Sequence, residues 1–195
     1  MEYRAILNWV EQGSAVLDLG CGTGTLLALL VREKGVRAQG IEINEQAIYE
    51  CVAKGLSVFH EDIDEGLSGY SNQSFDYVIL HQSLQQVKKL DYVLTEAMRV
   101  GRRVIVGFPN FAHYQARFQI FFTGKTPVTP SLPYEWHDTP NLHFLSISDF
   151  VDYCRKRSIK IEKTVFIGKH RKVKILPNLF ALTGIFLIQS PACQN

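Results

Sequence analysis

The chain has 195 residues, of which 46% are hydrophobic and 11% aromatic, and 21 Lys and Arg face 19 Asp and Glu for a net charge of +2. This length and composition predict one folded domain over residues 1–195 and exclude a disordered or collagen-like chain. The near-neutral charge gives no indication of binding to nucleic acid or to an acidic membrane.

Short apolar runs alternate with helical patterns over the first 110 residues. Glycines and Asn44 mark the helix ends, because glycine ends helices and asparagine caps their N-termini. Short connections between alternating strands and helices predict parallel pairing through right-handed crossovers, with helices on both faces of the sheet. The predicted strands are 15–19, 36–43, 56–60, 75–80 and 103–107, and the predicted helices are 25–34, 45–54 and 91–100.

The alternation stops at residues 109–145, which contain five prolines, and a helical pattern is limited to 111–122. Long irregular connections are uncommon and usually functional, so we expect an insertion that covers the mouth of the site. Its aromatic residues Tyr134 and Trp136 are expected to form the core of this lid. The insertion also contains three histidines, His113, His137 and His143. Together with Cys154 they lack the spacing of metal ligands, so we expect no metal site.

Regular structure returns with a predicted helix over 148–157, capped by Ser148, and two β-like runs over 160–167 and 180–188. No helix separates the two runs, so they should pair antiparallel. The basic loop between them, Lys169–Lys174, could bind an acidic partner or be a solvated hairpin tip. The whole pattern predicts an α/β fold, a Rossmann-like doubly wound, mostly parallel seven-stranded sheet with an antiparallel C-terminal hairpin strand.

The four cysteines are far apart and form no C-x-x-C pair: Cys21, Cys51, Cys154 and Cys193. Such spacing does not indicate a zinc site. Because no apolar signal sequence follows Met1, we expect free thiols and a cytoplasmic protein. The longest apolar run near the end of the chain is about half as long as a membrane span requires.

The segment 16–24, VLDLGCGTG, connects a strand to a helix. Glycines let the backbone approach a ligand closely, and a helix N-terminus offers free N–H groups. A dinucleotide favours G-x-G-x-x-G at such a turn, but the glycines here are Gly20, Gly22 and Gly24, and the third glycine of that pattern is missing. The carboxylate of Asp18 would repel a pyrophosphate and attract an ammonium. The loop therefore indicates a ligand with an amino group.

Further polar residues follow the next strands. Glu42, at the end of the second strand, can accept hydrogen bonds from both hydroxyls of a ribose. Asp62 and Ile63 come directly after the third strand. His81 follows the fourth strand and therefore faces the ligand end of the sheet, where it could be a general base or could only pack on the ligand.

The D-x-G-x-G-x-G pattern from Asp18 to Gly24 resembles the first motif of the class I S-adenosylmethionine-dependent methyltransferases. By that resemblance, residues 20–22 would lie along the methionine portion, and Asp18 would reach its ammonium directly or through water. Asp62 would contact the adenine amino group and Ile63 would pack on the ring. The resemblance implies a site for S-adenosylmethionine, or for its product S-adenosylhomocysteine, made of Asp18, Gly20, Cys21, Gly22, Gly24, Glu42, Ile43, Asp62, Ile63 and His81.

Nearly all of residues 4–190 resemble the MetW family of methionine biosynthesis proteins. The resemblance implies a role beside homoserine O-acyltransferase, the MetX-type enzyme that acylates homoserine, and brings no defined methyl acceptor. The segments that carry it are VLDLGCGTGTLLALL (16–30), GIEIN (40–44), DIDEGL (62–67), FDYVILHQSLQQV (75–87), GRRVIVGFPNFAHY (101–114) and the stretch that ends in TPNLHFLSISDF (139–150).

Three functions stay open. The chain could be a methyltransferase for a small-molecule or protein acceptor, with His81 as its catalytic residue. It could instead be a binding subunit that senses S-adenosylmethionine or its demethylated product and regulates the acyltransferase, with a coupling of typically ~1–3 kcal/mol. An NAD-dependent oxidoreductase is disfavoured by Asp18 and by the missing glycine. The lack of a compelling base or acceptor motif favours the binding subunit.

Overall fold

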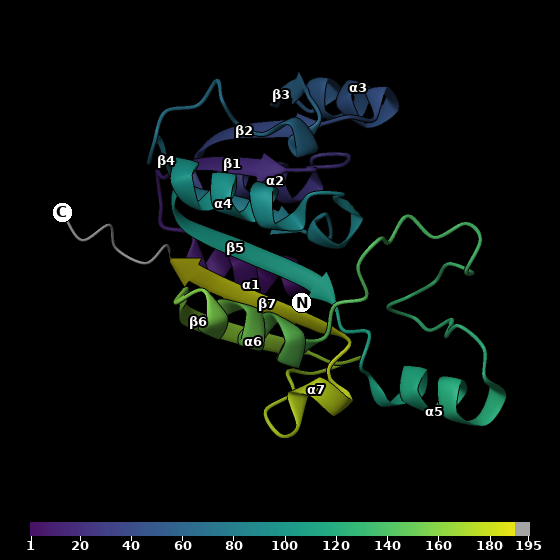
Figure 1. Cartoon of the computed structure of the whole chain (residues 1–195). Helices are drawn as coiled ribbons and strands as arrows, with labels where there is room; N and C mark the ends of the chain where they lie inside the picture. The colour runs from purple at the N-terminus through teal and green to yellow at the C-terminus, as the bar shows by residue number, and fades with distance from the viewer. Residues whose placement is uncertain (190–195) are drawn as a thin grey trace.

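The computed structural model describes residues 1–189, in which seven strands form one sheet (Figure 1). The strands are Ala15–Leu19 (β1), Arg37–Glu42 (β2), Ser57–His60 (β3), Phe75–His81 (β4), Gly101–Pro109 (β5), Lys160–Ile167 (β6) and Thr183–Gln189 (β7). Their order is β3-β2-β1-β4-β5-β7-β6. All pairs from β3 to β5 are parallel, and β7 runs antiparallel between β5 and β6. The predicted fold class is confirmed.

Helices cover both faces of this sheet, with α4 and α6 in front and α1 and α2 behind (Figure 1). None of the helices within residues 1–189 is long and apolar enough to cross a membrane. The α-helices are Glu2–Trp9 (α1), Thr25–Lys34 (α2), Glu45–Ala53 (α3), Leu90–Val100 (α4), Tyr114–Thr123 (α5), Ile147–Lys156 (α6) and Pro177–Phe180 (α7), and the short 3-10 helices are Ile63–Glu65 (η1) and Leu84–Gln86 (η2).

Strand β4 lies at the centre of the sheet and contributes to two apolar cores. Val78 and Leu80 face the core under α4, whereas Tyr77 and Ile79 face the core under α1 and α2. Alternate residues of a strand point to opposite faces, so a strand covered on both sides is apolar throughout. This explains the continuous apolar run that predicted β4.

Aromatic packing holds the antiparallel strand β7 to the parallel part of the sheet. Phe108 of β5 stacks on Phe186 of β7 with ring centroids 5.7 Å apart. Phe150 of α6 packs against both rings, at 5.2 and 4.8 Å. Aromatic pairs of this geometry contribute about 0.5–1.5 kcal/mol each beyond their buried area. They fix β7 and α6 beside β5.

Helix α1 is an element that the sequence analysis did not predict. It buries Ala5, Ile6 and Leu7 against the sheet, and Val10 follows in the same core. The helix is only 8 residues long and no side chain caps its N-terminus. A helix this short depends on tertiary packing, which leaves a weak local signal.

Two predicted boundaries near the C-terminal end were wrong. Ser146, not Ser148, caps α6: its hydroxyl accepts the Asp149 N–H, and the Asp149 carboxylate accepts the Ser146 N–H, which completes a capping box. The last strand begins at Thr183 rather than at residue 180, because Pro177 starts the short helix α7.

Residues 109–145 begin with the end of β5, continue as α5 and then form an irregular loop. Figure 1 shows α5 and this loop extending away from the sheet. The expectation that Tyr134 and Trp136 form a lid core was wrong, since these side chains are 47% and 74% exposed. Tyr134 shares a small cavity with Phe111, Leu132 and Phe144, but this packing leaves nearly half of the residue exposed.

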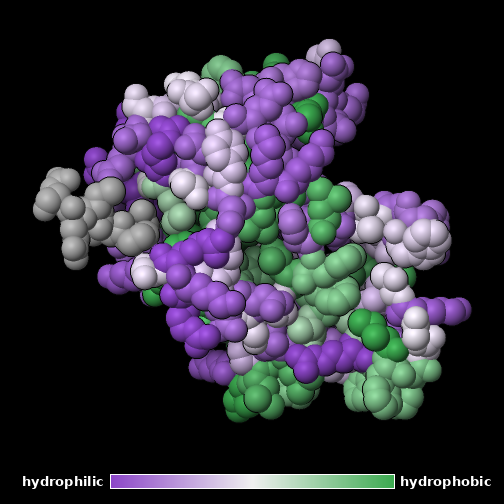
Figure 2. All heavy atoms as spheres, viewed as in Figure 1, coloured by the Kyte–Doolittle hydropathy of each residue, from purple (hydrophilic) through white to green (hydrophobic). Residues whose placement is uncertain are grey.

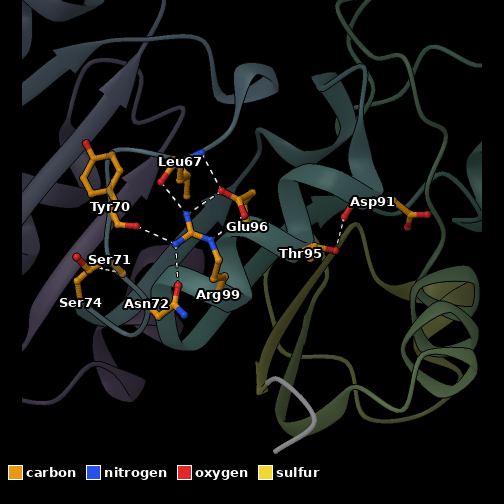
Figure 3. Close-up of polar contacts among 9 residues, drawn as sticks. All are labelled: Leu67, Tyr70, Ser71, Asn72, Ser74, Asp91, Thr95, Glu96 and Arg99. Atoms are coloured by element: carbon orange, nitrogen blue, oxygen red, sulfur yellow. Dashed lines mark hydrogen bonds and ion pairs between the residues drawn. The ribbon is translucent and has the colours of Figure 1, made fainter. Parts of the chain in front are cut away.

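One arginine holds the loop that leads into β4 (Figure 3). The guanidinium of Arg99 donates hydrogen bonds to the carbonyls of Leu67 and Tyr70 and to the Asn72 side chain, at 2.7 to 2.9 Å. It also donates to both carboxylate oxygens of Glu96 at 2.8 Å, and these bonds hold the Glu96 pKa below its usual value. A planar guanidinium can satisfy this fork of acceptors, and an ammonium cannot.

Replacing Arg99 by lysine therefore tests the network. We expect Arg99→Lys to lower the free energy of unfolding by about 1–3 kcal/mol, because loop carbonyls lose their donors. Urea unfolding measures this change. The matched control is Arg155→Lys, whose side chain is 74% exposed and pairs only with Asp152; its effect should stay within about 0.5 kcal/mol. Equal effects of the two variants would contradict the role of Arg99.

Candidate functional site

A cavity of about 510 Å³ opens at the carboxyl ends of the parallel strands. Its walls are the glycine loop after β1, the end of β2, the segment after β3, and residues 81–83 and 86–88 at and after the end of β4, and Tyr3 of α1 also lines it. We call it the main cavity. Doubly wound sheets bind their ligands at this edge, where the strand order reverses.

Nine of the ten predicted cofactor residues line the main cavity: Asp18, Gly20, Cys21, Gly22, Glu42, Ile43, Asp62, Ile63 and His81. Gly24 is the exception, because it caps α2 and packs toward Cys51 and Leu56. Gln82 and Ser83, in the turn after His81 that was expected to face the ligand, also line the cavity, and so does Tyr3, which was not predicted. Tyr3 had no detectable signal, since its helix was not predicted.

The glycine loop owes its shape to left-handed backbone conformations. The φ angles of Gly20, Gly22 and Gly24 are +73°, +53° and +71°, a region that costs other residues roughly 1–2 kcal/mol. The Gly20 N–H donates to the Ile41 carbonyl at 2.9 Å. A Cβ atom on Gly20 would lie only 2.8 Å from the Cβ of Ser83. The loop therefore approaches the turn after β4 as closely as glycine permits.

The Glu42 side chain holds the glycine loop in place through its carboxylate. One carboxylate oxygen accepts the Gly22 N–H at 2.7 Å, and the other accepts the N–H groups of Ile43 and Asn44, each at 2.9 Å. A carboxylate offers about four acceptor positions, and three are used here, so about one is left for a hydroxyl group of a ligand. The same side chain thus holds the backbone in place and faces the cavity.

Asp18 is a buried acid, 3% exposed, on the floor of the main cavity. Burial, and to a smaller extent the negative charge of Glu42, raise the pKa of Asp18 from 3.8 to about 7. No ion pair within residues 1–189 neutralises this carboxylate, and no hydrogen bond lowers its pKa. A cation placed beside it would relieve both unfavourable effects.

His81 connects β4 to helix α1. Its Nε2 lies 3.1 Å from the Glu2 carboxylate, which also accepts the Thr183 hydroxyl at 2.7 Å. Burial raises the pKa of Glu2, but the hydrogen bonds from His81 and Thr183 outweigh it, so the pKa lies below its usual value. The other ring nitrogen, Nδ1, is buried and has no hydrogen-bond partner among residues 1–189, and a Cβ on Gly107 would come within 2.3 Å of it. One nitrogen is therefore engaged and the other faces the backbone.

A second cavity of about 780 Å³ adjoins the first. We call it the side cavity. It shares Tyr3, His81 and Gln82 with the main cavity, and Pro130 and Ser131 of the insertion form part of its wall. Gln82 has a φ of +63°, an uncommon conformation for a residue with a side chain. Such conformations often occur at functional sites.

Residues 109–145 do not line the main cavity, but they are bound to its wall. The N–H groups of Leu142 and His143 donate to the Gln85 carbonyl at 2.9 and 3.0 Å. The His143 Nε2 lies 3.0 Å from the Val87 carbonyl, and Val87 lines the cavity. A displacement of the insertion would therefore be transmitted directly to the turn after β4.

Ser83 has an unsatisfied hydroxyl. The residue is 8% exposed, lines the main cavity, and its Oγ has no hydrogen-bond partner within residues 1–189. A buried polar group without a partner costs about 1–3 kcal/mol. A ligand with a polar group beside the glycine loop would remove this cost.

Cys21 and Cys51 both direct their sulfur atoms at the Gly22 carbonyl, at 3.8 and 3.1 Å. Burial raises the pKa of both thiols, so they stay protonated. These two cysteines and Cys154 are free, and Cys193 lies outside the described residues. No three His, Cys, Asp or Glu side chains among residues 1–189 are placed to hold a metal ion.

Comparison with known proteins places this site in context. The family model for methionine biosynthesis protein MetW matches residues 1–188. The bifunctional methionine biosynthesis protein MetXA/MetW of Rhodopirellula baltica is 35% identical over 187 residues, which cover 91% of this chain and 30% of that protein. The chain spans about a third of the length of the curated relatives it matches.

Solved structures share the fold. An S-adenosylmethionine-dependent methyltransferase of Thermotoga maritima, described as a possible histamine N-methyltransferase, has a TM-score of 0.70 at 17% identity, covering 97% of this chain and 87% of its own. The cyclase SpnF has a TM-score of 0.67 at 14% identity, covering 97% and 80%. The fold is thus that of class I methyltransferases, and it occurs with more than one named activity.

Gly20→Ala tests how closely the glycine loop approaches Ser83. We expect a loss of about 2–4 kcal/mol in the free energy of unfolding, from the left-handed φ and from the contact with the Ser83 Cβ. Gly13→Ala is the matched control, because Gly13 has a φ of +74° but no atom within 4 Å of an added Cβ. It should lose about 1–2 kcal/mol. Equal losses in urea unfolding would mean that the contact has no energetic effect.

Proposed function

The chain belongs to the MetW family of methionine biosynthesis proteins, and on this premise we propose that it binds S-adenosylmethionine or S-adenosylhomocysteine and acts with a homoserine O-acyltransferase as its cofactor-sensing subunit. The observation that carries the cofactor assignment is the buried, unneutralised carboxylate of Asp18 on the floor of the main cavity. The partner assignment is supported by the relative that is named for both MetXA and MetW.

The residues of the main cavity fit this nucleoside. Asp18 suits the ammonium of the amino-acid end, and Glu42 has about one acceptor position left for a ribose hydroxyl. Asp62 accepts the Asp64 N–H with one oxygen, which leaves the other for the adenine amino group, and Ile63 offers an apolar surface to the ring. The unsatisfied hydroxyl of Ser83 can bond to the methionine portion.

The charge of the lining disfavours a dinucleotide. Five acidic residues and a single lysine line the main cavity, the acids being Asp18, Glu42, Glu61, Asp62 and Asp64. A pyrophosphate would be repelled by this excess of carboxylates, whereas the sulfonium and ammonium of S-adenosylmethionine would be attracted. The lining therefore supports S-adenosylmethionine over NAD.

Sensing requires that cofactor binding change a surface that the acyltransferase contacts. The turn after β4 can transmit such a change, because Ser83 and Val87 line the cavity while the Gln85 carbonyl binds the insertion at residues 142–143. A coupling free energy of about 1–3 kcal/mol would change the affinity between the two proteins roughly 5- to 150-fold. Reciprocally, the acyltransferase would tighten or weaken cofactor binding by the same factor.

Methyl transfer is a second candidate function, favoured by the side cavity. That cavity meets the main one at Tyr3, His81 and Gln82, so an acceptor there would lie beside the cofactor. In-line displacement needs chiefly this proximity and alignment. His81 would act as a base only after releasing Glu2. Label carried from methyl-labelled S-adenosylmethionine into an acceptor would favour this function over sensing alone.

Isothermal titration with S-adenosylmethionine, S-adenosylhomocysteine and NAD tests the cofactor assignment. We expect the first two ligands to bind and NAD not to bind. Glu42→Ala should weaken binding at least about tenfold, because one charge-assisted hydrogen-bond acceptor is worth about 1.5–3 kcal/mol. Glu45→Ala, which removes an exposed acid that does not line the cavity, should leave the affinity unchanged. Binding of NAD alone would overturn the assignment.

The pH dependence of binding tests Asp18. With a pKa of about 7, the carboxyl changes from mostly protonated at pH 6 to mostly ionised at pH 8. The ammonium binds the ionised form, so we expect the affinity for S-adenosylhomocysteine to rise up to about tenfold over this range. Asp18→Asn should bind more weakly and lose this rise. An unchanged pH profile in Asp18→Asn would contradict the contact.

The free protein provides an independent check of the same pKa. Because folding raises the pKa of Asp18 from 3.8 to about 7, the folded state binds more protons than the unfolded state between these values. The contribution of Asp18 to stability is therefore present below pH 4 and declines as the pH rises toward 7. Urea unfolding across this range should show a smaller decline for Asp18→Asn than for the wild-type chain.

A further inference from the structure

Helix α5 carries a row of exposed aromatic side chains. Tyr114, Phe118 and Phe122 follow one another at helical spacing, with ring centroids 6.2 and 5.9 Å apart. Tyr114 also contacts Phe180 of α7, at 6.1 Å, so the row continues onto a second element. Phe121 packs edge-on against Phe122 at 4.9 Å. We call these five residues the aromatic ladder.

The ladder is open to solvent. Phe118, Phe121 and Phe122 are 57%, 81% and 73% exposed, and Phe180 is 46% exposed. Figure 2 shows apolar side chains gathered in two areas at the lower edge of the molecule, over α7 and over α5. Exposed apolar side chains occur singly on most proteins, but a contiguous aromatic row marks a surface that another molecule covers.

The region beside the ladder is hollowed rather than flat. A groove of about 460 Å³ lies between α6 and α7 and is lined by Ile147, Val151, Leu176 and Pro177, among others. Ile175 and Leu176 stand at its edge and are 77% and 62% exposed. A groove of this size accepts projecting side chains of a folded protein, which a planar lipid surface does not supply.

A positively charged loop precedes the groove residues of α7 in the sequence. The loop Lys169–Lys174 leads from β6 toward α7, and its cations are exposed and form no ion pair among residues 1–189: Lys169, Arg171, Lys172 and Lys174. Charges at the rim of an interface direct association with a partner of opposite sign. The surface therefore fits a protein that presents apolar side chains bordered by carboxylates.

We propose that the aromatic ladder and the adjoining groove form the docking surface for the homoserine O-acyltransferase; this inference rests on the proposed function. The occupant follows from the partner assigned there, and from where the ladder lies. Helix α5 belongs to the segment that donates hydrogen bonds from Leu142 and His143 to the Gln85 carbonyl, at the wall of the main cavity. A partner bound to the ladder would therefore contact the same insertion that is hydrogen-bonded to the turn beside the main cavity.

Binding of the full chain to the homoserine O-acyltransferase of the same organism, measured by biolayer interferometry, tests this surface. Phe121→Glu places a charge at the most exposed position of the ladder and should weaken binding at least about 30-fold, since aromatic anchors are among the strongest contributors at interfaces. Tyr49→Glu on α3, where the side chain is 67% exposed, is the matched control and should bind like the wild-type chain. Lys172→Glu should slow association several-fold, and added salt should reduce this effect.

The same preparations are titrated with S-adenosylmethionine, because Phe121→Glu should leave cofactor binding intact and thereby show that the variant is folded. If the wild-type chain bound both the acyltransferase and S-adenosylmethionine, and Phe121→Glu bound the acyltransferase equally well, the ladder would not be the docking surface. The proposed function would then still stand. Cofactor binding without any acyltransferase binding would overturn the surface together with the partner assignment, and binding of neither would overturn the whole function.

Two other occupants of the ladder would each overturn the inference. If Phe121→Glu abolished self-association in sedimentation velocity but kept the affinity for the acyltransferase, the ladder would be the interface between two copies of this chain. If it abolished binding to phosphatidylglycerol vesicles and kept that affinity, the ladder would be a lipid contact. Loss of acyltransferase binding in Phe121→Glu, with the Tyr49→Glu control intact, supports the docking surface.

Discussion

The contact between the Glu42 carboxylate and the Gly22 N–H is the interaction on which the site depends. The glycine loop has three left-handed residues and few side chains, and the hydrogen bond from the Gly24 N–H to the Cys21 carbonyl holds it only in part. Glu42 supplies the missing constraint, because its two oxygens bind the loop on one side and the start of α3 on the other. The resulting fixed negative charge also helps raise the pKa of Asp18. One side chain thus helps to fix the loop and contributes to the charge of the cavity.

Most of the site could be predicted from the sequence because its parts are local. Glycines after β1 and acids after β2 and β3 are each placed by their own strand, and parallel pairing brings the strand ends together. The contact between His81 and Glu2 could not be predicted in this way. It joins the second residue of the chain to residue 81, and the sequence of α1 contains no strong capping or periodic signal. The same reason explains why Tyr3 was missed.

The insertion shows a different limit of sequence reasoning. Aromatic residues between 109 and 145 indicate burial, and a sequence does not distinguish burial inside the chain from burial against another protein. Tyr134 and Trp136 were assigned to an internal core, yet both are exposed. The shift of the α6 cap from Ser148 to Ser146 is a smaller, local error. Both serines precede helical residues, and only the capping box with Asp149 identifies Ser146 as the cap.

The turn after β4 is where the separate parts of the molecule meet. Gln82, in its left-handed conformation, bonds to Glu2 of α1, while Ser83 closes on the glycine loop and Gln85 holds the insertion. An element with an uncommon backbone conformation and an unsatisfied buried hydroxyl stores free energy that a ligand can release. A cofactor that satisfied Ser83 would stabilise this turn, and through Gln85 it would also stabilise the insertion. The turn after β4 therefore connects the lining of the main cavity to residues 142–143 of the insertion by direct hydrogen bonds, without any large rearrangement of the sheet.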